Sequence, residues 1–475
     1  MSADVAAIAA ASGGTIHGEP STIVVAATHD SRAVVPGTLF CCVPGANVDG
    51  HDFASKAIED GAAALLVERS MSGDRVPEIV VPDVRAAMGL AAAEVYDRPS
   101  DELSVIGVTG TNGKSSIVQL AADVWSRAGH RAEIYGTLTG ARTTPEATDL
   151  QRRLRESLDQ RIDTVAIEVS SHALALSRVV GTRFAAAIFT NLGRDHLDFH
   201  HDMDSYFAAK AELFTSRYTD LAIVNSDDPY GARLAVRVAE TDDVELVEYG
   251  LADAGDLTID GPTSRFQWRG HEVVLQLAGL HNVANALGAA TAAAALGLDT
   301  NDIADALCAT APVRGRFELI DVGQPFMLAV DYAHTPDALE AVLNASRQVS
   351  DGKVIVVFGC GGDRDEEKRP EMGLVVDRGA DIAVVTSDNP RSEDPQAIID
   401  AVTGGMTAGD SGKPASRVVV EPDRRAAIAV ALAEARAGDL VLIAGKGHEA
   451  VQLIGDQELP FDDRQVALEE LGALA

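Results

Sequence analysis

One stretch decides how this chain folds: Val105-Ile-Gly-Val-Thr-Gly-Thr-Asn-Gly-Lys-Ser-Ser116. A β-prone run leads into three glycines and Lys114-Ser115, and a helical pattern of apolar residues follows as far as Gly129. A strand, a glycine loop and a helix start make a cradle for phosphates, because backbone N–H groups and the positive helix end face the anion. The pattern predicts that Lys114 contacts the β- and γ-phosphates of a nucleotide and that Ser115 binds Mg²⁺.

The match to the strict phosphate-loop pattern is imperfect. That pattern has a glycine five residues before Gly113, where this chain has Val108, and the nearby glycine is Gly107. The alternative is a glycine-rich turn with a surface lysine. The strand and the helix on either side of the loop favour the phosphate cradle.

Size and composition limit the remaining possibilities. A chain of 475 residues with 46% hydrophobic and 23% charged residues is typical of about three globular domains. The net charge, 39 − 72 = −33, opposes binding to nucleic acid and to anionic membranes. It also repels nucleotides, so a phosphate site must gather positive charge locally. The alternative explanation, which requires no function for the acidity, is a solvated acidic surface.

The chain carries no obvious targeting or membrane signal. Its four cysteines show neither metal-ligand spacing nor a disulfide framework, and the N-terminus lacks a basic segment before its apolar residues. Its apolar runs are shorter than the roughly 18 residues of a membrane span. We therefore expect a soluble, cytoplasmic protein with reduced thiols. We also expect a monomer, although none of these features bears on the oligomeric state.

Residues 1–98 are predicted to form a small N-terminal α/β domain, with a strand over residues 22–27. Ser31 and Asn47 lie in predicted loops. They could hydrogen-bond a nucleobase or phosphate, or they could only cap turns.

Residues 99–313 are predicted to form a central domain of the phosphate-loop mononucleotide-binding type. The run Thr164-Val-Ala-Ile-Glu168 is a buried-type strand that ends in a carboxylate. If it pairs in parallel with the phosphate-loop strand, Glu168 lies near the Mg²⁺ position, because ligands gather at the carboxyl ends of strands. Residues 191–201 hold three histidines and several acids without zinc spacing, so we expect one or two metal ligands there and otherwise scaffold.

Lys210 lies on the apolar face of a predicted helix whose cap is expected at Asp204. It is spaced i+3 from Phe207 and i−4 from Phe214. A lysine there either extends its amine to solvent, which the spacing alone favours, or is functional. Burial lowers the pKa of an amine, and a neutral amine can add CO₂ to form a carbamate that binds Mg²⁺.

Residues 314–475 are predicted to form a C-terminal Rossmann-like domain. Four apolar strands there each lead into a polar loop, and a doubly wound sheet would bring these loops to one rim. Arginines and acids on that rim suit a zwitterionic ligand, because arginine forks bind carboxylates and acids hold ammonium groups. The alternative is that these polar residues only form ordinary turns between the strands and the helices. Asn282, before this domain, could contact adenine or cap a helix.

Several ordered motifs together make the chain resemble the Mur ligases over nearly its whole length. The matching segments run from the first predicted domain to the last. They are Asp30-Ser-Arg32, Gly110-Thr-Asn-Gly-Lys-Ser-Ser116, Thr143-Thr-Pro-Glu146, Glu168-Val-Ser-Ser-His172, 191–198, Ala209-Lys210, His281-Asn282, Gly315-Arg-Phe-Glu318, Asp331-Tyr-Ala-His-Thr-Pro336, Gly361-Gly-Asp-Arg-Asp365, Asp388-Asn-Pro-Arg391 and Gly445-Lys-Gly-His-Glu449.

The resemblance implies an ATP- and Mg²⁺-dependent amide ligase of peptidoglycan precursor synthesis. Such an enzyme phosphorylates the D-glutamyl carboxylate of UDP-N-acetylmuramoyl-L-alanyl-D-glutamate, and the amine of meso-2,6-diaminopimelate then attacks the acyl phosphate. The resemblance implies a role in catalysis for Lys114, Glu168, His196 and Lys210. It implies a role in metal binding for Ser115, Glu168, His196 and a carbamylated Lys210, which reverses the preference for a solvent-directed amine.

The remaining implied roles concern ligand binding. The residues implied to bind ATP are Gly110, Thr111, Asn112, Gly113, Lys114, Ser115, Ser116, Asn282, Arg316 and Asp331. Those implied to bind the UDP-muramoyl dipeptide are Ser31, Thr143, Thr144, Ser170 and Arg178. Those implied to bind diaminopimelate are Arg364, Asp388, Asn389, Pro390, Arg391, Gly445 and Glu449. The resemblance implies that Arg391 selects this amino acid, since relatives that add lysine lack the arginine.

The chain departs from the family pattern at Leu176, where many members have Gln, at Gly193, where Ser is frequent, and at Arg314, where Pro is common. Three other functions are possible for such a chain. A folylpolyglutamate-synthase-like ligase is disfavoured by Thr143-Thr144-Pro and 388–391. An inactive nucleotide-binding regulator is disfavoured by the presence of Lys114, Glu168 and Lys210. A simple phosphate-loop kinase or ATPase leaves the first domain and the rim without a role.

Overall fold

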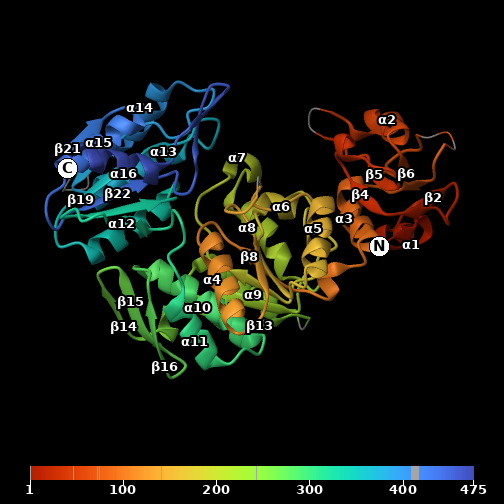
Figure 1. Cartoon of the computed structure of the whole chain (residues 1–475), viewed down its shortest axis with the longest axis horizontal. Helices are drawn as coiled ribbons and strands as arrows, with labels where there is room; N and C mark the ends of the chain where they lie inside the picture. The colour runs from red at the N-terminus through yellow and green to blue at the C-terminus, as the bar shows by residue number, and fades with distance from the viewer. Residues whose placement is uncertain are drawn as a thin grey trace.

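The computed structural model describes residues 2–45, 48–71, 73, 75–140, 142–241, 243–407 and 417–474. Asn47 lies outside these residues. The chain forms three α/β units, each built on its own sheet, with the first (red) and the last (blue) on opposite sides of the central one (Figure 1). The predicted fold class, a three-domain α/β protein, is confirmed.

The N-terminal unit contains a five-stranded sheet covered by short helices. Its elements are β1 (Ala3–Asp4), α1 (Val5–Ser12), β2 (Thr15–His17), β3 (Ile23–Val24), β4 (Ala26–Thr28), β5 (Thr38–Cys41), α2 (Ala54–Glu59), β6 (Ala62–Val67), β7 (Glu78–Val80) and α3 (Val84–Val95). The order is β2-β7-β6-β5-β4, with β2 antiparallel and the others parallel. The single strand expected over residues 22–27 is wrong, because β3 pairs with β1 and β4 pairs with β5.

The central unit holds a six-stranded sheet. Its elements are β8 (Ser104–Thr109), α4 (Lys114–Arg127), β9 (Ala132–Tyr135), α5 (Ala147–Asp159), β10 (Thr164–Glu168), α6 (Ser171–Ala175), β11 (Ala186–Phe189), α7 (Leu197–His200), α8 (Met203–Ala211), β12 (Leu221–Asn225), α9 (Pro229–Ala239), β13 (Glu245–Tyr249), β14 (Gly255–Asp260), β15 (Thr263–Trp268), β16 (His271–Leu275), α10 (Leu280–Ala295) and α11 (Thr300–Ala309). The order β13-β12-β11-β8-β10-β9 is parallel throughout, so the phosphate-loop strand lies inside the sheet.

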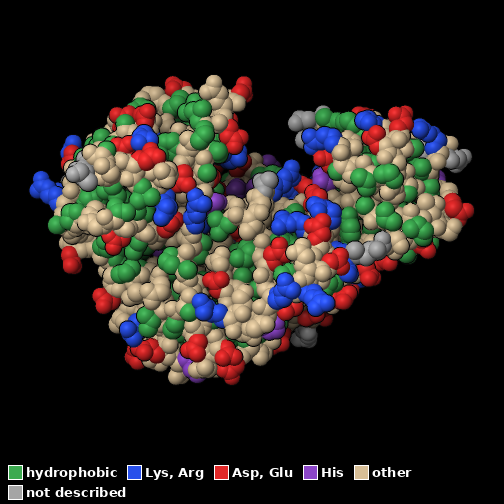
Figure 2. Space-filling view, in the orientation of Figure 1, with side chains coloured by type: hydrophobic (Ala, Val, Ile, Leu, Met, Phe, Trp, Pro, Cys, Tyr) green, Lys and Arg blue, Asp and Glu red, His purple; other side chains and the backbone are tan. Residues whose placement is uncertain are grey.

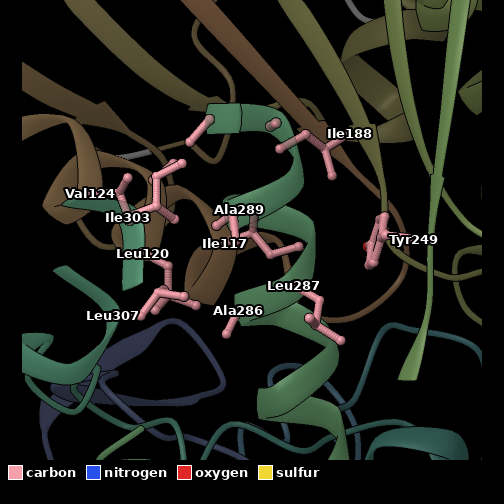
Figure 3. Packing of buried hydrophobic residues seen from close by; sticks show 14 of the residues in the cluster. Ile117, Leu120, Val124, Ile188, Tyr249, Ala286, Leu287, Ala289, Ile303 and Leu307 are labelled. Carbon is pink, nitrogen blue, oxygen red and sulfur yellow. The ribbon is translucent and has the colours of Figure 1, made fainter. Parts of the chain in front are cut away.

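Helix α4 is fixed by the apolar spacing that follows the glycine loop. Ile117, Leu120 and Val124 lie on one buried face, at intervals of three and four residues. Figure 3 shows Ile117 against Ala289 of α10, and Leu120 and Val124 near α11. The opposite sheet face has its own core, so β8 is buried on both sides and reads as a continuous apolar run.

Strands β14, β15 and β16 form an antiparallel three-stranded sheet that the sequence did not predict. Phe266 and Trp268 alternate with exposed residues along β15 and pack into the core of the central unit. Only one face of this sheet is buried, which accounts for the alternation.

The C-terminal unit is a second parallel sheet with helices on both faces. Its elements are β17 (Glu318–Leu319), β18 (Met327–Asp331), α12 (Pro336–Val349), β19 (Val354–Phe358), α13 (Lys368–Gly379), β20 (Ile382–Val385), α14 (Pro395–Thr407), β21 (Arg417–Val420), α15 (Arg424–Glu434), β22 (Leu440–Ala444), β23 (Val451–Ile454), β24 (Gln457–Pro460) and α16 (Asp463–Leu474). The order is β17-β18-β22-β19-β20-β21, with only β17 antiparallel within this sheet. The polar loops after β18, β19, β20 and β22 therefore share one rim, as expected.

The cap expected for the helix of Lys210 is wrong by two residues. Asp202, in an extended conformation, accepts a hydrogen bond from the Ser205 N–H at 2.7 Å and begins α8. Asp204 lies inside the first turn and forms a 2.6 Å ion pair with Arg233. Only an extended residue can aim its side chain back at the free N–H groups of the first turn.

Within the described part of the chain, no helix combines the length and the apolar character needed to cross a membrane.

Candidate active site

The glycines of the phosphate loop are required by close contacts. A Cβ on Gly107 would come within 2.7 Å of the Phe184 ring, and one on Gly110 would lie 1.8 Å from Thr190 Oγ1. Gly113 begins α4 at a left-handed φ of 86°. The packing of Phe184 against β8 thus gives a local reason for a glycine at 107, while Val108 is buried in the core.

The loop's Lys114 is turned back onto the loop. Its ammonium donates to the carbonyls of Gly110 and Thr111 at 2.8 and 2.9 Å. Burial lowers the pKa of this amine. The ammonium thus lies against the phosphate loop, and an incoming phosphate can replace the two carbonyls as its partner.

Ser115, Glu168 and Arg316 meet beside the loop. The Ser115 hydroxyl donates to Glu168 Oε1 at 2.9 Å, and the Arg316 guanidinium donates to the Ser115 oxygen, also at 2.9 Å. Glu168 arrives there because β10 pairs in parallel with β8, with Glu168 opposite Val108. The expected proximity of Glu168 to the phosphate loop is confirmed, and Arg316 links the loop to the C-terminal unit.

These residues line a cavity of about 550 Å³ between the central and C-terminal units. The cavity brings together thirteen of the residues predicted from the sequence. They are Thr111, Asn112, Gly113, Lys114, Ser115, Ser116, Thr143, Glu168, Ser170, His196, Asn282, Arg316 and Asp331. Tyr332 and His334, which were not predicted, line it as well.

Asn282 and Asp331 lie on opposite units of this cavity. Asn282 is buried, and its amide donates to the Ala278 carbonyl at 2.8 Å, while Gly279 occupies the cap position of α10. The helix-cap interpretation of Asn282 is therefore wrong. Asp331 accepts hydrogen bonds from the Phe317 and Ala333 N–H groups at 2.6 and 2.7 Å, and burial raises the pKa of its carboxyl.

The histidine-rich loop is mainly aromatic packing. His172 lies edge-on to His196 with ring centroids 4.8 Å apart, and His200 lies 5.0 Å from the Tyr206 ring. His196 Nε2 is 3.3 Å from Asp195 Oδ2, and burial lowers the pKa of His196 to about 3. A neutral imidazole keeps a lone pair for a metal ion.

Lys210 is 1% exposed, so the interpretation of a solvent-directed amine is wrong. Its amine donates to the Gly110 carbonyl at 2.8 Å and lies 4.7 Å from the centre of the Tyr206 ring. Burial, followed by the charge of Lys114, lowers its pKa well below the ordinary value. An amine with a lowered pKa is thus placed against the phosphate loop.

The residues predicted for the muramoyl substrate fall into different surroundings. Thr143 and Ser170 face the first cavity, whereas Thr144 is fully buried and its hydroxyl donates to the Glu168 carbonyl at 2.8 Å. Ser31 lines a second cavity of about 660 Å³ between the N-terminal and central units. Arg178 pairs with Glu146 of that cavity at 2.9 Å.

Five arginines and three acids are among the residues that line this second cavity. Sequence analysis missed Arg85 and Arg142, which share the carboxylate of Glu146 with Arg178. Figure 2 shows the surface hollowed between the N-terminal and C-terminal units, with Lys and Arg side chains (blue) on its margin. Positive charge is therefore gathered locally on a chain whose net charge is −33, as a phosphate site requires.

The residues predicted for the amino acid lie on the rim of the C-terminal sheet. Asn389 donates to Glu449 Oε2 at 2.9 Å, which joins the loops after β20 and β22. Arg391, at a left-handed φ of 52°, donates to the Gly362 carbonyl at 2.7 Å. Asp388 is buried, its Oδ2 has no hydrogen-bond partner in the described structure, and burial raises the pKa of its carboxyl.

The other rim candidates frame this group. A Cβ on Gly445 would lie 2.5 Å from Asp388 Oδ2, so a glycine is needed beside that carboxylate. The Pro390 carbonyl accepts from the Glu393 N–H at 3.1 Å, and Arg364 is exposed with one bond to the Asp363 carbonyl at 2.8 Å. Tyr332 connects the rim to the first cavity, since its hydroxyl lies 3.3 Å from Glu449 Oε1.

Two of the three departures from the family pattern have a structural reason. A Cβ on Gly193 would lie 1.7 Å from Oδ2 of the exposed Asp337 side chain of α12, so a side chain there would require that carboxylate to move. Arg314 forms a 2.6 Å ion pair with Asp462. Nothing in the structure explains Leu176.

Comparison with known proteins covers nearly the whole chain. Residues 24–96 match the Mur ligase family catalytic domain, residues 108–293 the Mur ligase middle domain, and residues 315–447 the Mur ligase glutamate ligase domain. The UDP-N-acetylmuramoyl-L-alanyl-D-glutamate–2,6-diaminopimelate ligase of Syntrophomonas wolfei is 44% identical, over 93% of this chain and 94% of its own. The ligase of the same name from Streptomyces coelicolor is also 44% identical, over 95% and 93%.

A solved structure of a UDP-N-acetylmuramoyl-L-alanyl-D-glutamate–2,6-diaminopimelate ligase is 32% identical, with a TM-score of 0.69, and covers 100% of this chain and 99% of its own. Sequence and fold agree over all three units. This chain belongs to the Mur ligase family.

Proposed function

We propose that this chain joins meso-2,6-diaminopimelate to the D-glutamyl carboxylate of UDP-N-acetylmuramoyl-L-alanyl-D-glutamate, with conversion of ATP to ADP and phosphate, in peptidoglycan precursor synthesis. Relatives that carry the corresponding ligase name are 41–45% identical over 92–95% of this chain. The observation that carries the proposal is the first cavity, where the phosphate loop, Glu168 and Arg316 meet, connected through Tyr332 to a rim that holds Arg391.

The reaction takes place in two steps. The D-glutamyl carboxylate attacks the γ-phosphorus of ATP and releases ADP, which gives an acyl phosphate. The amine of diaminopimelate attacks the acyl carbon, and the tetrahedral intermediate loses phosphate and a proton to leave the amide. Because the protein forms no bond to the transferred group, its contribution is positioning and electrostatic support.

The phosphate loop supplies most of that support. We assign the N–H groups of residues 110–116 and the ammonium of Lys114 to the phosphates. Lys114 exchanges its loop carbonyls for phosphate oxygens, and Arg316 adds a second cation from the C-terminal unit. Asn282 and Asp331, with Arg316, are assigned to the nucleotide.

Mg²⁺ fits the oxygens beside the loop. Ser115 and Glu168 present hydroxyl and carboxylate oxygens 2.9 Å apart, which are the hard ligands that Mg²⁺ prefers. Bound there, Mg²⁺ would neutralise phosphate charge. His196, with its lowered pKa, is assigned to the metal as well.

Lys210 is assigned to the metal as a carbamate. In its neutral form the amine attacks CO₂, one proton leaves, and the product carries a carboxylate-like oxygen pair. The burial of the amine at 1% exposure and its lowered pKa favour this addition. The carbon-13 NMR signal of a carbamate after incubation with labelled bicarbonate, present in the wild type and absent in Lys210→Ala, tests the assignment without an activity measurement.

The three substrates occupy different parts of the molecule in this proposal. Ser31 and the arginines of the second cavity contact the UDP portion, and Thr143, Ser170 and Arg178 contact the muramoyl dipeptide. Thr144 acts by holding the Glu168 strand end rather than by contacting substrate. Diaminopimelate binds at the rim, to Arg364, Asp388, Asn389, Pro390, Arg391, Gly445 and Glu449.

Domain boundaries after residues 98 and 313, a monomeric state and a cytoplasmic location are part of the same proposal. Size-exclusion chromatography with light scattering tests the monomeric state.

An amino-acid panel in a phosphate-release assay tests the function. With ATP and the purified nucleotide dipeptide, phosphate should appear with meso-diaminopimelate and at most weakly with L-lysine or L-glutamate. Equal turnover with L-lysine would contradict the assigned specificity. Phosphate release without any amine would instead indicate a simple ATPase.

A further inference from the structure

Lys446 is a fully buried cation that none of the assigned roles uses. It lies in the Gly445–Glu449 turn after β22, with a side-chain exposure of 0%. Its ammonium donates to the Asn389 side-chain oxygen at 3.1 Å, to Glu449 Oε2 at 3.1 Å and to the Val451 carbonyl at 2.6 Å. All three N–H groups of the ammonium are thereby used, and two of the acceptors are rim residues assigned to diaminopimelate.

The contact with Lys446 fixes which way round the Asn389 amide lies. The side-chain oxygen accepts from the Lys446 ammonium and from the Leu453 N–H, at 3.1 and 3.0 Å, so two donors hold it. The amide nitrogen donates one hydrogen to Glu449 at 2.9 Å. Since an amide nitrogen carries two hydrogens, Asn389 offers the ligand a donor and no acceptor.

Lys446 also fixes the charge and position of Glu449. Glu449 Oε2 accepts from both Lys446 and Asn389, which leaves Oε1 with the Tyr332 hydroxyl at 3.3 Å. Burial opposes ionisation of Glu449, but the ammonium of Lys446 and the Asn389 amide outweigh it and lower the pKa of the carboxyl. Glu449 is therefore held as an anion with one oxygen able to accept from an ammonium.

We propose that Lys446 is a positioning residue for the amino-acid substrate. From below the rim it holds Asn389 with its N–H toward a substrate carboxylate and Glu449 with its oxygen toward a substrate ammonium. Lys446 itself touches no ligand, because its side chain is fully buried. This inference rests on the proposed function and adds to it a residue on which recognition of one α-amino acid centre of diaminopimelate depends.

The test is Lys446→Met, which keeps the length of the side chain and removes its charge. Because the variant leaves a buried acceptor pair without its shared donor, the KM for meso-diaminopimelate should rise by about 10- to 100-fold. The KM values for ATP and for the nucleotide dipeptide should stay within about twofold, since neither site contacts Lys446. Lys353→Met is the control, because Lys353 is an exposed lysine next to the opposite end of β19; it should leave all three KM values unchanged.

A double-mutant cycle separates positioning from a general structural role. Because Lys446 acts through both Asn389 and Glu449, Lys446→Met combined with Asn389→Ala should raise the KM for diaminopimelate by less than the product of the two single changes. Multiplying effects, or equal rises in all three KM values, would overturn the inference.

A further variant covers the case in which Lys446→Met does not fold, as judged by circular dichroism. Asn389→Asp keeps both contacts of the side-chain oxygen and removes the donor. It should weaken diaminopimelate binding by at least as much as the lysine variant, and unchanged binding would overturn the inference. A wild-type protein with no diaminopimelate-dependent phosphate release would instead refute the proposed function, so the two failures are distinguishable.

Discussion

The buried ion pair beneath the rim offers the sharpest stability prediction. Arg424 and Asp463 are both 0% exposed and are joined by two bonds of 2.8 and 2.7 Å, and Arg424 also donates to the Ala444 carbonyl at 3.0 Å. Arg424→Met leaves the Asp463 carboxylate buried without its partner, which costs about 3–5 kcal/mol. Backbone amides of β22 should then exchange hydrogen roughly 10²- to 4 × 10³-fold faster, because each 1.4 kcal/mol is a factor of ten.

Hydrogen exchange followed by mass spectrometry measures the exchange rates of the C-terminal unit separately from those of the rest of a multidomain chain. Arg425→Met is the matched control, because Arg425 is a neighbouring arginine that is half exposed and pairs with Glu469 and Glu470. Surface pairs contribute about 0–1 kcal/mol, so exchange should change by less than about fivefold. Arg424→Met combined with Asp463→Leu should recover most of the loss. Equal acceleration in the two single variants, or no recovery in the double variant, would refute the argument.

Three further predictions concern Glu168, Lys210 and His200. Glu168→Gln should lower kcat in the phosphate-release assay by about 10²-fold or more, because it removes the carboxylate charge that would hold Mg²⁺ beside the phosphates; a loss below tenfold would contradict its assignment. Lys210→Ala should abolish most activity without rescue by bicarbonate, and near-normal turnover would exclude the carbamate. Burial lowers the pKa of His200 to about 4 from its ordinary 6.5, so the unfolded chain binds more protons between these values. Stability should therefore fall by up to about 3 kcal/mol as pH drops from 6.5 to 4. His200→Phe should flatten that slope in urea titrations.

Local pattern predicted the central strands well. The strand at Thr164–Glu168 has the predicted bounds, because it is a short, continuous apolar run buried on both faces. The three-stranded sheet of β14, β15 and β16 was missed. Few apolar side chains mark the alternation of buried and exposed residues in these strands. The alternation identifies a sheet only once one face packs on the central core.

The site was predictable where one rule of topology sufficed. Glu168 was placed beside the phosphate loop because parallel strands end at the same edge, and the rim loops were grouped for the same reason. The arginine group around Glu146 was not predicted, because Arg85, Arg142 and Arg178 come from separate segments and meet only when two units pack together.

By itself the sequence determined the phosphate cradle, the three-unit α/β order and, through the family resemblance, the expected chemistry. These depend on local spacing and on motifs that can be read along one segment. Only the tertiary structure decided which way a side chain faces and what satisfies it. It placed the amine of Lys210 inside the molecule, committed the hydroxyl of Thr144 to a strand end, and set Lys446 beneath the rim. Burial and hydrogen-bond partners are properties of the packed chain, and the free energy of a buried charge depends on groups distant in sequence.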